Sequence, residues 1–211
     1  MLNRTLVIAG IMALGIAWIW PVPQLAQQAF FGHMIMHMLN VAVAAPLLSL
    51  AIAGSRFDPV DRCPWLFVAI PASVVELIIV WGWHAPVPHH VARMHPAGLA
   101  AEQLMFLISG LWVWLSAVGG TSDVTRRGRR GTGVIGLLLT SMHMTLLGAL
   151  LGLSPRSLYP HHDGFGLLSS VADQHLGGAI MLVVGGVAYL AGGLWLTLEV
   201  LSPCAVDGQR P

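Results

Sequence analysis

Charged residues are scarce in this sequence of 211 residues. Asp, Glu, Lys and Arg together make up 9%, against roughly 25% in a soluble globular protein, while hydrophobic residues make up 56%. So few charges exclude a water-soluble domain, and lipid is the expected solvent for most of the chain. Lysine is absent and the net charge is only +1. The basic surface that nucleic-acid binding requires is therefore missing as well.

Hydrophobic blocks of roughly the 20 residues that a helix needs to cross the hydrocarbon core recur along the chain. Six of them, bounded by proline, glycine or charge, cover residues 5–20, 31–53, 65–83, 98–118, 133–153 and 177–198. The sequence therefore predicts an all-α, polytopic membrane helix bundle of about six transmembrane helices, forming a single domain over residues 1–211. The first block lacks a small-residue cleavage site, which favours a retained helix over a signal peptide.

The arginines are distributed unevenly between the two predicted sides of the membrane. With the N-terminus in the cytoplasm, eight of the ten arginines fall on inner segments and only Arg93 and Arg156 on outer loops. This follows the positive-inside rule, so both termini are predicted to be cytoplasmic and the run from Arg126 to Arg130 is interpreted as a topology anchor. Cys63 and Cys204 also fall on the cytoplasmic side, where a disulfide is not expected.

Ten histidines stand out in a chain so poor in other titratable groups. In the predicted topology none lies on the cytoplasmic side and only His143 lies near mid-membrane. The others lie at outer helix ends (His33, His37, His84 and His175) or in outer loops (His89, His90, His95, His161 and His162). Histidines scattered through a core would have no reason to choose one side, so this asymmetry indicates a shared function. The two His-His doublets are expected to be exposed loop groups or transient metal-capturing groups.

One helix face of the second block combines imidazole, thioether and amide groups. His33, Met36, His37 and Asn40 share this face because they are spaced i, i+3, i+4 and i+7. Such a surface suits copper, and Cu(I) in particular, rather than magnesium or calcium. Alternatively, the histidines hydrogen-bond to neighbouring helices and the methionines fill space. The candidate metal ligands are His33, Met36, His37, His84, His143 and His175.

Three acidic residues are candidates for groups that orient these ligands. Glu76 and Glu102 fall inside predicted spans, where a carboxyl group must be protonated, paired or hydrated. Asp173 lies close to His175, just before the sixth span. They could relay protons, orient a metal-bound imidazole or contact the histidines directly. The sequence does not choose among these roles.

An ordered series of short motifs covers roughly residues 30 to 195. It comprises His33-Met-Ile-Met-His37-Met with Ala45-Pro46-Leu47-Leu48, Trp83-His84-Ala-Pro86, Glu102 with Phe106-Leu107 and Gly110 to Trp114, Leu147 to Leu151, Leu158-Tyr159-Pro160, and Ala172 to Gly178. This series resembles the multi-span cytochrome c oxidase assembly factor family called CtaG. The sequence departs from the family pattern at Gln103, where a histidine is expected, and at His175, where glutamine is commoner.

The resemblance implies an integral protein of the bacterial inner membrane that is needed to mature haem–copper oxidase. It implies copper as the metal and a haem–copper cytochrome c oxidase subunit as the partner, besides membrane lipid, and a homo-oligomer stays open. The hypothesis is a metallochaperone rather than an enzyme. Its stripe of His33, Met36 and His37 would receive Cu(I), while His84, His143 and His175 would complete or relay coordination.

Two alternatives remain open from the residues alone. A histidine-rich membrane di-iron oxygenase or desaturase is suggested by the His33-x3-His37 spacing and the His-His doublets, although the outward placement of the histidines opposes it. A b-type cytochrome would bind one haem between His37 and His143.

Overall fold

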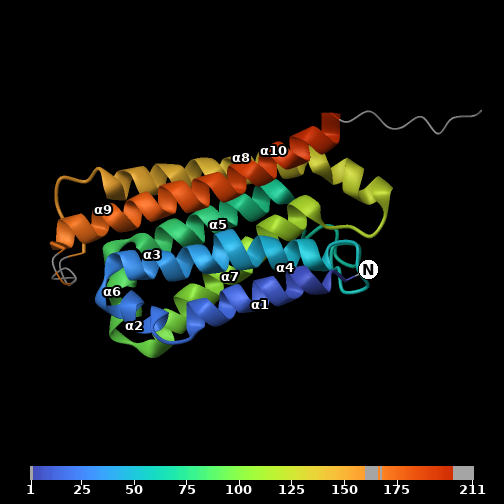
Figure 1. Cartoon of the computed structure of the whole chain (residues 1–211). Coiled ribbons are helices and arrows are strands. Elements are labelled where there is room, and N and C mark those ends of the chain that lie inside the picture. Colours follow the sequence, from blue (N-terminus) through green and yellow to red (C-terminus); the bar gives the residue numbers. More distant parts are fainter. Residues whose placement is uncertain (1, 160–165, 167, 202–211) are drawn as a thin grey trace, which may run out of the picture.

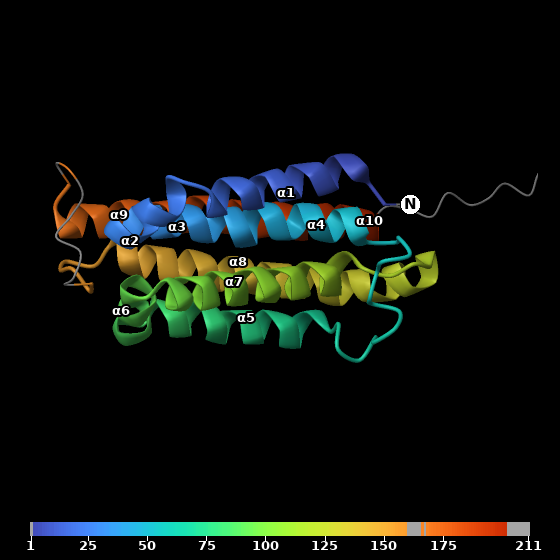
Figure 2. The same ribbon diagram turned by 90° about the horizontal axis from the view of Figure 1, so that it is seen from below.

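The all-α prediction is confirmed by the computed structural model, which describes residues 2–159, 166 and 168–201, except for the side chains of residues 123–125 (Figures 1 and 2). Helices account for 79% of the chain, and the described residues contain no strand. The elements are α1 (Arg4–Trp18), α2 (Val22–Gln28), α3 (Phe30–Met38), the π-helical η1 (Leu39–Ala44), α4 (Ala45–Ile52), α5 (Ala69–His84), α6 (Pro86–Met94), α7 (Pro96–Val118), α8 (Asp123–Gly152), α9 (Ser170–Ile180), the π-helical η2 (Met181–Gly185) and α10 (Gly186–Leu201).

Four of these helical stretches are long and apolar enough to cross a membrane without a break. They cover Phe30–Ile52, Pro96–Val118, Arg126–Gly152 and Ser170–Leu201. Two further spans arise if bent pairs are each counted as one: α1 with α2, bent by 46°, and α5 with α6, bent by 71°. The described part of the chain thus has four to six candidate spans, in agreement with a multi-pass membrane bundle of about six helices.

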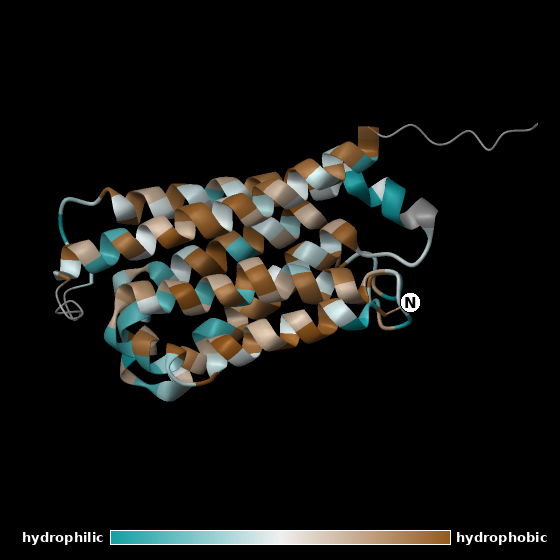
Figure 3. Cartoon of the chain, in the orientation of Figure 1, coloured by the Kyte–Doolittle hydropathy of each residue, from teal (hydrophilic) through white to brown (hydrophobic). Residues whose placement is uncertain are grey.

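The surface of the bundle has the apolar character that lipid requires. Ile11, Ile78, Ile108, Leu146 and Leu198 point outward and are each more than half exposed. A soluble domain would bury most of such side chains. Figure 3 shows hydrophilic residues concentrated at the two ends of the bundle, around α2 and α6 at one end and along the first turns of α8 at the other.

The two ends of the bundle differ in which elements they carry. One end holds α2, α6 and the starts of α3 and α9, whereas the N-terminus and the loop between α4 and α5 lie at the other (Figure 1).

The arginine-rich start of α8 is helical from Asp123, about ten residues before the predicted block begins. Arginine is a good helix former, so the helix continues beyond its apolar segment. Cys63 is a free thiol, and Cys204 lies outside the described residues.

Residues 85–95 do not form the expected outer loop. Pro86 to Met94 fold into helix α6, which turns back from the end of α5. Pro86 begins α6 and Pro96 begins α7, which are positions where a proline costs no helix hydrogen bond because the first N–H groups have no intrahelical partner. The two prolines are thus a sequence signal for the start of α6 and of α7, whereas the polar residues between them favour a loop.

The π-helical segment η1 follows directly from a proline in the same span. Pro46 has no N–H group to donate to the carbonyl groups of the preceding turn. In the wider π register, which pairs residues five apart, the carbonyl group left without a backbone donor is that of Val41. The Tyr189 hydroxyl of α10 lies 3.3 Å from this carbonyl oxygen. A side chain from another helix thus takes the place of the missing backbone donor.

Close packing between α8 and α9 depends on glycine. A Cβ atom at Gly148 would lie 2.8 Å from the Gly178 carbonyl oxygen, and one at Gly178 would lie 2.7 Å from that of Gly148. The two backbones therefore approach each other as small residues in membrane helices permit.

Candidate metal site

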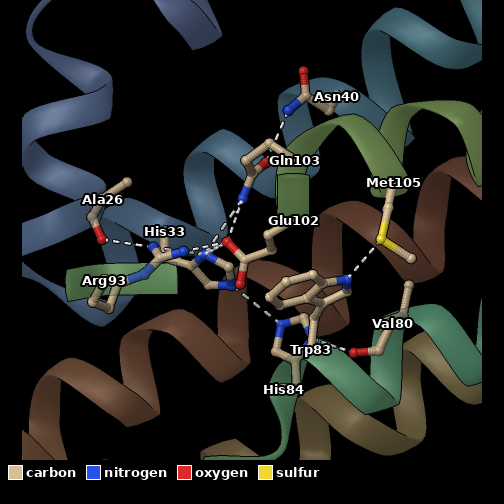
Figure 4. Close-up of polar contacts among 10 residues, drawn as sticks. All are labelled: Ala26, His33, Asn40, Val80, Trp83, His84, Arg93, Glu102, Gln103 and Met105. Carbon is tan, nitrogen blue, oxygen red and sulfur yellow. Dashed lines mark hydrogen bonds and ion pairs between the residues drawn. The ribbon is translucent and has the colours of Figure 1, made fainter. Parts of the chain in front are cut away.

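Four histidines gather inside the end of the bundle that carries α2 and α6. Each is at most 4% exposed, although they come from three different helices. Arg93 of α6 and the pair Glu102 and Gln103 of α7 complete the cluster, as the close-up in Figure 4 shows. The four histidines are His33 and His37 of α3, His84 of α5 and His89 of α6.

His33 and His84 face each other through their Nε2 atoms, which are 3.4 Å apart. The Nδ1 atom of His84 lies 2.6 Å from the Val80 carbonyl oxygen, which can only accept a hydrogen bond. His84 therefore carries its proton on Nδ1 and leaves Nε2 as an acceptor. This second contact also fixes the orientation of the ring, as hydrogen bonds commonly do for metal-binding histidines.

Arg93 determines the protonation of His33. Its guanidinium group lies 3.0 Å from His33 Nδ1 and always donates, since it does not lose its proton in proteins. His33 therefore accepts at Nδ1, carries its own proton on Nε2 and donates it to His84. The hydrogen bonds run in one direction, from Arg93 through both rings to the backbone of α5.

The Glu102 carboxylate is the anionic partner of this chain. It is fully buried, its Oε2 atom forms an ion pair with Arg93, and the same oxygen lies 3.4 Å from His33 Nδ1. Gln103 donates to Glu102 over 3.2 Å and accepts from Asn40 over 2.9 Å. Burial of a carboxylate in a membrane protein requires such partners. Glu102 therefore contacts His33, one of the candidate ligands.

His89 was expected to be an exposed loop group, and this expectation is wrong. Its side chain is only 1% exposed because the bend between α5 and α6 brings it against Phe30 and His33 at the start of α3. Its ring lies 4.9 Å from that of His33 and 4.5 Å from that of Tyr159, measured between centroids. His33, His89 and Glu102 each offer a ligand atom within 4.8 Å of the others. His90 is half-buried and His95 is exposed.

His37 and His143 are buried imidazoles without hydrogen bonds on either ring nitrogen. His37 lies against Phe106 and 5.3 Å from the His84 ring, measured between centroids, and it is within electrostatic range of His143. Most buried polar groups in native proteins do have a hydrogen-bond partner. His37, next to His84, and His143, near His37, therefore each leave a nitrogen lone pair available to a ligand.

Met36 and His175, two other candidate ligands, have neighbours outside this cluster. The Met36 side chain packs against Ala17, Ala26 and Leu99 on the side of α3 that faces α1 and α7. His175 is half-buried and its Nε2 atom donates to the Ser154 carbonyl oxygen over 2.8 Å. The structure does not bring either side chain together with His33 and His84.

Glu76 belongs to a second buried polar cluster, deeper in the bundle. Tyr189 donates a hydrogen bond of 2.7 Å to one carboxylate oxygen, and Thr140 donates one of 3.1 Å to the other. Ser73 pairs with Thr140 over 2.8 Å. The cluster joins α5, α8 and α10, and its hydrogen bonds satisfy a carboxyl group that would otherwise be very costly at this depth.

Asp173 acts on the site through the backbone of α3. Its fully buried carboxylate accepts hydrogen bonds of 2.8 Å from the N–H groups of Phe30 and Phe31. These are two of the donors that a helix start leaves without an intrahelical partner, and the N-cap residue Ala29 offers no side-chain acceptor. Asp173 therefore fixes the first turn of α3, one turn before His33.

Tyr159, in the connection between α8 and α9, packs against the histidine cluster. Its hydroxyl donates to the His84 carbonyl oxygen over 2.8 Å, and its ring stacks on Phe30 at 4.5 Å. Burial raises the pKa of Tyr159, with a further contribution from the Glu102 charge, so the hydroxyl stays a donor. Nothing in the sequence pattern had assigned it this role. His161 and His162, which follow it, lie outside the described residues.

The gathering of histidines at one end of the bundle agrees with the asymmetry predicted from the topology. Comparison with known proteins places the sequence in a family. A model of the family described as cytochrome c oxidase caa3 assembly factor matches residues 3–202, which is nearly the whole chain. No curated protein matches the sequence. No solved structure matches it either.

Proposed function

The chain belongs to the cytochrome c oxidase caa3 assembly factor family, and we propose that it assists assembly by binding Cu(I) at His33 and His84 and passing it to a haem–copper oxidase subunit in the bacterial inner membrane. The family description is that of an assembly factor, in agreement with the prediction that the chain is not an enzyme. The same description favours this function over a di-iron oxygenase or a b-type cytochrome.

The distance between His33 Nε2 and His84 Nε2 is the observation that carries the proposal. Two nitrogens bound to one ion at about 2.0 Å, with an angle of about 115° between them, lie about 3.4 Å apart. The two Nε2 atoms are separated by this distance, and the Nδ1 atom of each ring is engaged elsewhere. Imidazole binds copper well, and a pair of neutral rings suits Cu(I) better than it suits magnesium or calcium.

His37 and His143 provide a route for transfer within the protein. Because neither ring nitrogen of either residue has a hydrogen-bond partner, both can accept an ion from the first pair without breaking an existing bond. The buried side chains of Met38 and Met144, which belong to the same core, both pack against Gly185, Met38 through its sulfur atom. Thioethers are soft ligands that prefer Cu(I). A carrier has to release its ion, and several weak donors in sequence serve that purpose better than one closed cage.

The test is an anaerobic Cu(I) titration of the purified full-length protein against a competing chelator. His84→Leu removes one nitrogen of the proposed pair and should weaken Cu(I) binding at least tenfold, with loss of copper from the oxidase in cells that carry the variant. His95→Leu is the matched control, because this histidine is exposed at the same end of the bundle. Equal Cu(I) affinities of the two variants and normal oxidase maturation in both would exclude the proposed site.

A further inference from the structure

Arg93 is a cation in direct contact with the histidine cluster. Its side chain is 6% exposed, and it donates to the Ala26 carbonyl oxygen over 2.8 Å, to His33 Nδ1 over 3.0 Å and to Glu102. A buried arginine in a membrane protein is expensive and usually marks function. Copper binding at His33 and His84 does not by itself require a cation here, and a positive charge beside a copper site opposes binding.

The contact between Arg93 and His33 also blocks one of the two proposed ligand atoms. While Arg93 donates to Nδ1, the His33 proton sits on Nε2, the atom that faces His84. A protonated ring nitrogen has no lone pair for a metal. His33 can therefore bind an ion through Nε2 only after its proton has moved to Nδ1, and Arg93 must first leave that atom.

An acceptor for the moved proton is already in place. Glu102 Oε2 lies 3.4 Å from His33 Nδ1, so it can accept a hydrogen bond from a protonated Nδ1 once Arg93 has withdrawn. The result is a carboxylate–histidine–metal arrangement, which is the common way to orient a metal-bound imidazole. The step is balanced by exchange with water: Nε2 gives up one proton and Nδ1 takes one up, so the number of protons on the His33 ring is unchanged and there is no net release.

We propose that Arg93 is an exchangeable cation that holds the site closed when it is empty, leaves His33 and Glu102 when Cu(I) binds, and returns to help expel the ion. This inference rests on the proposed function, because it assumes that His33 and His84 bind copper. In this proposal Arg93 promotes the release of Cu(I), which a carrier needs and which the histidines alone do not provide.

The balance of charge determines which metal ions can replace Arg93. The Arg93–Glu102 pair is neutral overall, and replacing the guanidinium charge by Cu(I) keeps it neutral. Zn(II) or Cu(II) would leave one uncompensated positive charge in a site of low dielectric constant, which is strongly unfavourable. The exchange therefore selects a monovalent soft cation, and Ag(I) should behave like Cu(I).

Substitutions at Arg93 test the exchange on the purified full-length protein in detergent. Arg93→Gln keeps a donor for Glu102 but removes the competing charge, so Cu(I) and Ag(I) should bind at least tenfold more tightly and dissociate more slowly into a chelator. Arg93→Lys keeps the charge but cannot reach three acceptors as the guanidinium fork does, and should give an intermediate affinity. Arg156→Gln removes an exposed arginine at the same end of the bundle and should leave affinity unchanged.

A purely structural role for Arg93 predicts the opposite order. If Arg93→Gln binds Cu(I) as the wild type does or more weakly, or if the wild type binds Zn(II) as tightly as Ag(I), the exchange is refuted while copper binding itself stands. If the wild type binds no Cu(I), the proposed function fails first and the exchange fails with it.

A second measurement does not depend on the stability of the variants. Modification of the wild-type protein with phenylglyoxal, followed by peptide mass spectrometry, reports the accessibility of each arginine. Arg93 should react faster after loading with Ag(I), and Arg156 should not change. Equal protection of Arg93 with and without Ag(I) would show that it stays in place, and would overturn the proposal.

Discussion

Replacement of Asp173 should destabilise the protein and weaken metal binding together, although Asp173 does not touch the histidines. Its carboxylate accepts two buried backbone hydrogen bonds of 2.8 Å at the start of α3. A hydrogen bond to a charged group contributes about 1.5–3 kcal/mol. Asp173→Ala removes both and should lower the free energy of unfolding by about 3–6 kcal/mol on this basis. Asp173→Asn keeps one acceptor oxygen and should lose about half as much.

The assay is reversible unfolding in mixed detergent micelles, combined with the Cu(I) titration. Since Phe30 and Phe31 form the turn before His33, fraying of that turn should shift the ring away from His84 and reduce Cu(I) affinity in the same order, with Ala worse than Asn. Asp61→Asn is the matched control, because the Asp61 carboxylate also accepts from an N–H group and a hydroxyl, but on the exposed loop before α5. It should cost less than about 0.5 kcal/mol.

Two results would refute this reasoning. One is an equal loss of stability in the Asp173 and Asp61 variants, because burial would then have no influence on the strength of the carboxylate contacts. The other is a stable Asp173→Ala protein with normal Cu(I) affinity, because the start of α3 would then be held by something other than this carboxylate.

Two further predictions concern the other carboxylates. Glu76→Leu removes the acceptor of the 2.7 Å hydrogen bond from Tyr189 and of the 3.1 Å bond from Thr140, and leaves Tyr189 with its longer 3.3 Å contact to the Val41 carbonyl oxygen. It should lower the free energy of unfolding by about 2–4 kcal/mol, whereas Glu76→Gln should cost much less. Equal losses in the micelle unfolding assay would contradict a hydrogen-bonding role. The Thr121 hydroxyl and N–H group hold the pKa of Asp61 below its usual 3.8. This contribution is present above pH 3.8 and is lost as the pH falls through the lowered pKa, so acid should destabilise the wild type more than Asp61→Asn in pH-dependent unfolding.

The spans and the clustering of histidines could be predicted from the sequence, because both depend on local patterns. Hydropathy identifies a membrane helix from its own residues. The predicted topology then places the helix ends that carry His33 and His84 on the same side of the membrane. The hydrogen-bond partners of the site residues could not be predicted in this way. Asp173 bonds to a helix 142 and 143 residues away, and such pairing leaves no trace in a single sequence.

Helical periodicity alone could not separate Met36 from the histidines. A helix that is buried on all sides has packing partners all around it. The i, i+3, i+4 spacing of His33, Met36 and His37 therefore does not show which neighbouring helix each side chain contacts. His33 and His37 lie against His84 of α5 and Phe106 of α7, whereas Met36 packs against Ala17 of α1, Ala26 of α2 and Leu99 at the start of α7. The burial of His89 and Arg93 depends on the 71° bend between α5 and α6, which hydropathy does not detect.

The prolines that bracket α6 have a mechanical consequence. Pro86 and Pro96 offer no N–H group to the segments before them, so few backbone hydrogen bonds join this nine-residue helix to α5 on one side and to α7 on the other. The withdrawal of Arg93 in the proposed exchange would then need only a rigid-body rocking of α6 about its two ends. The proposed copper site would open without unfolding of the neighbouring helices.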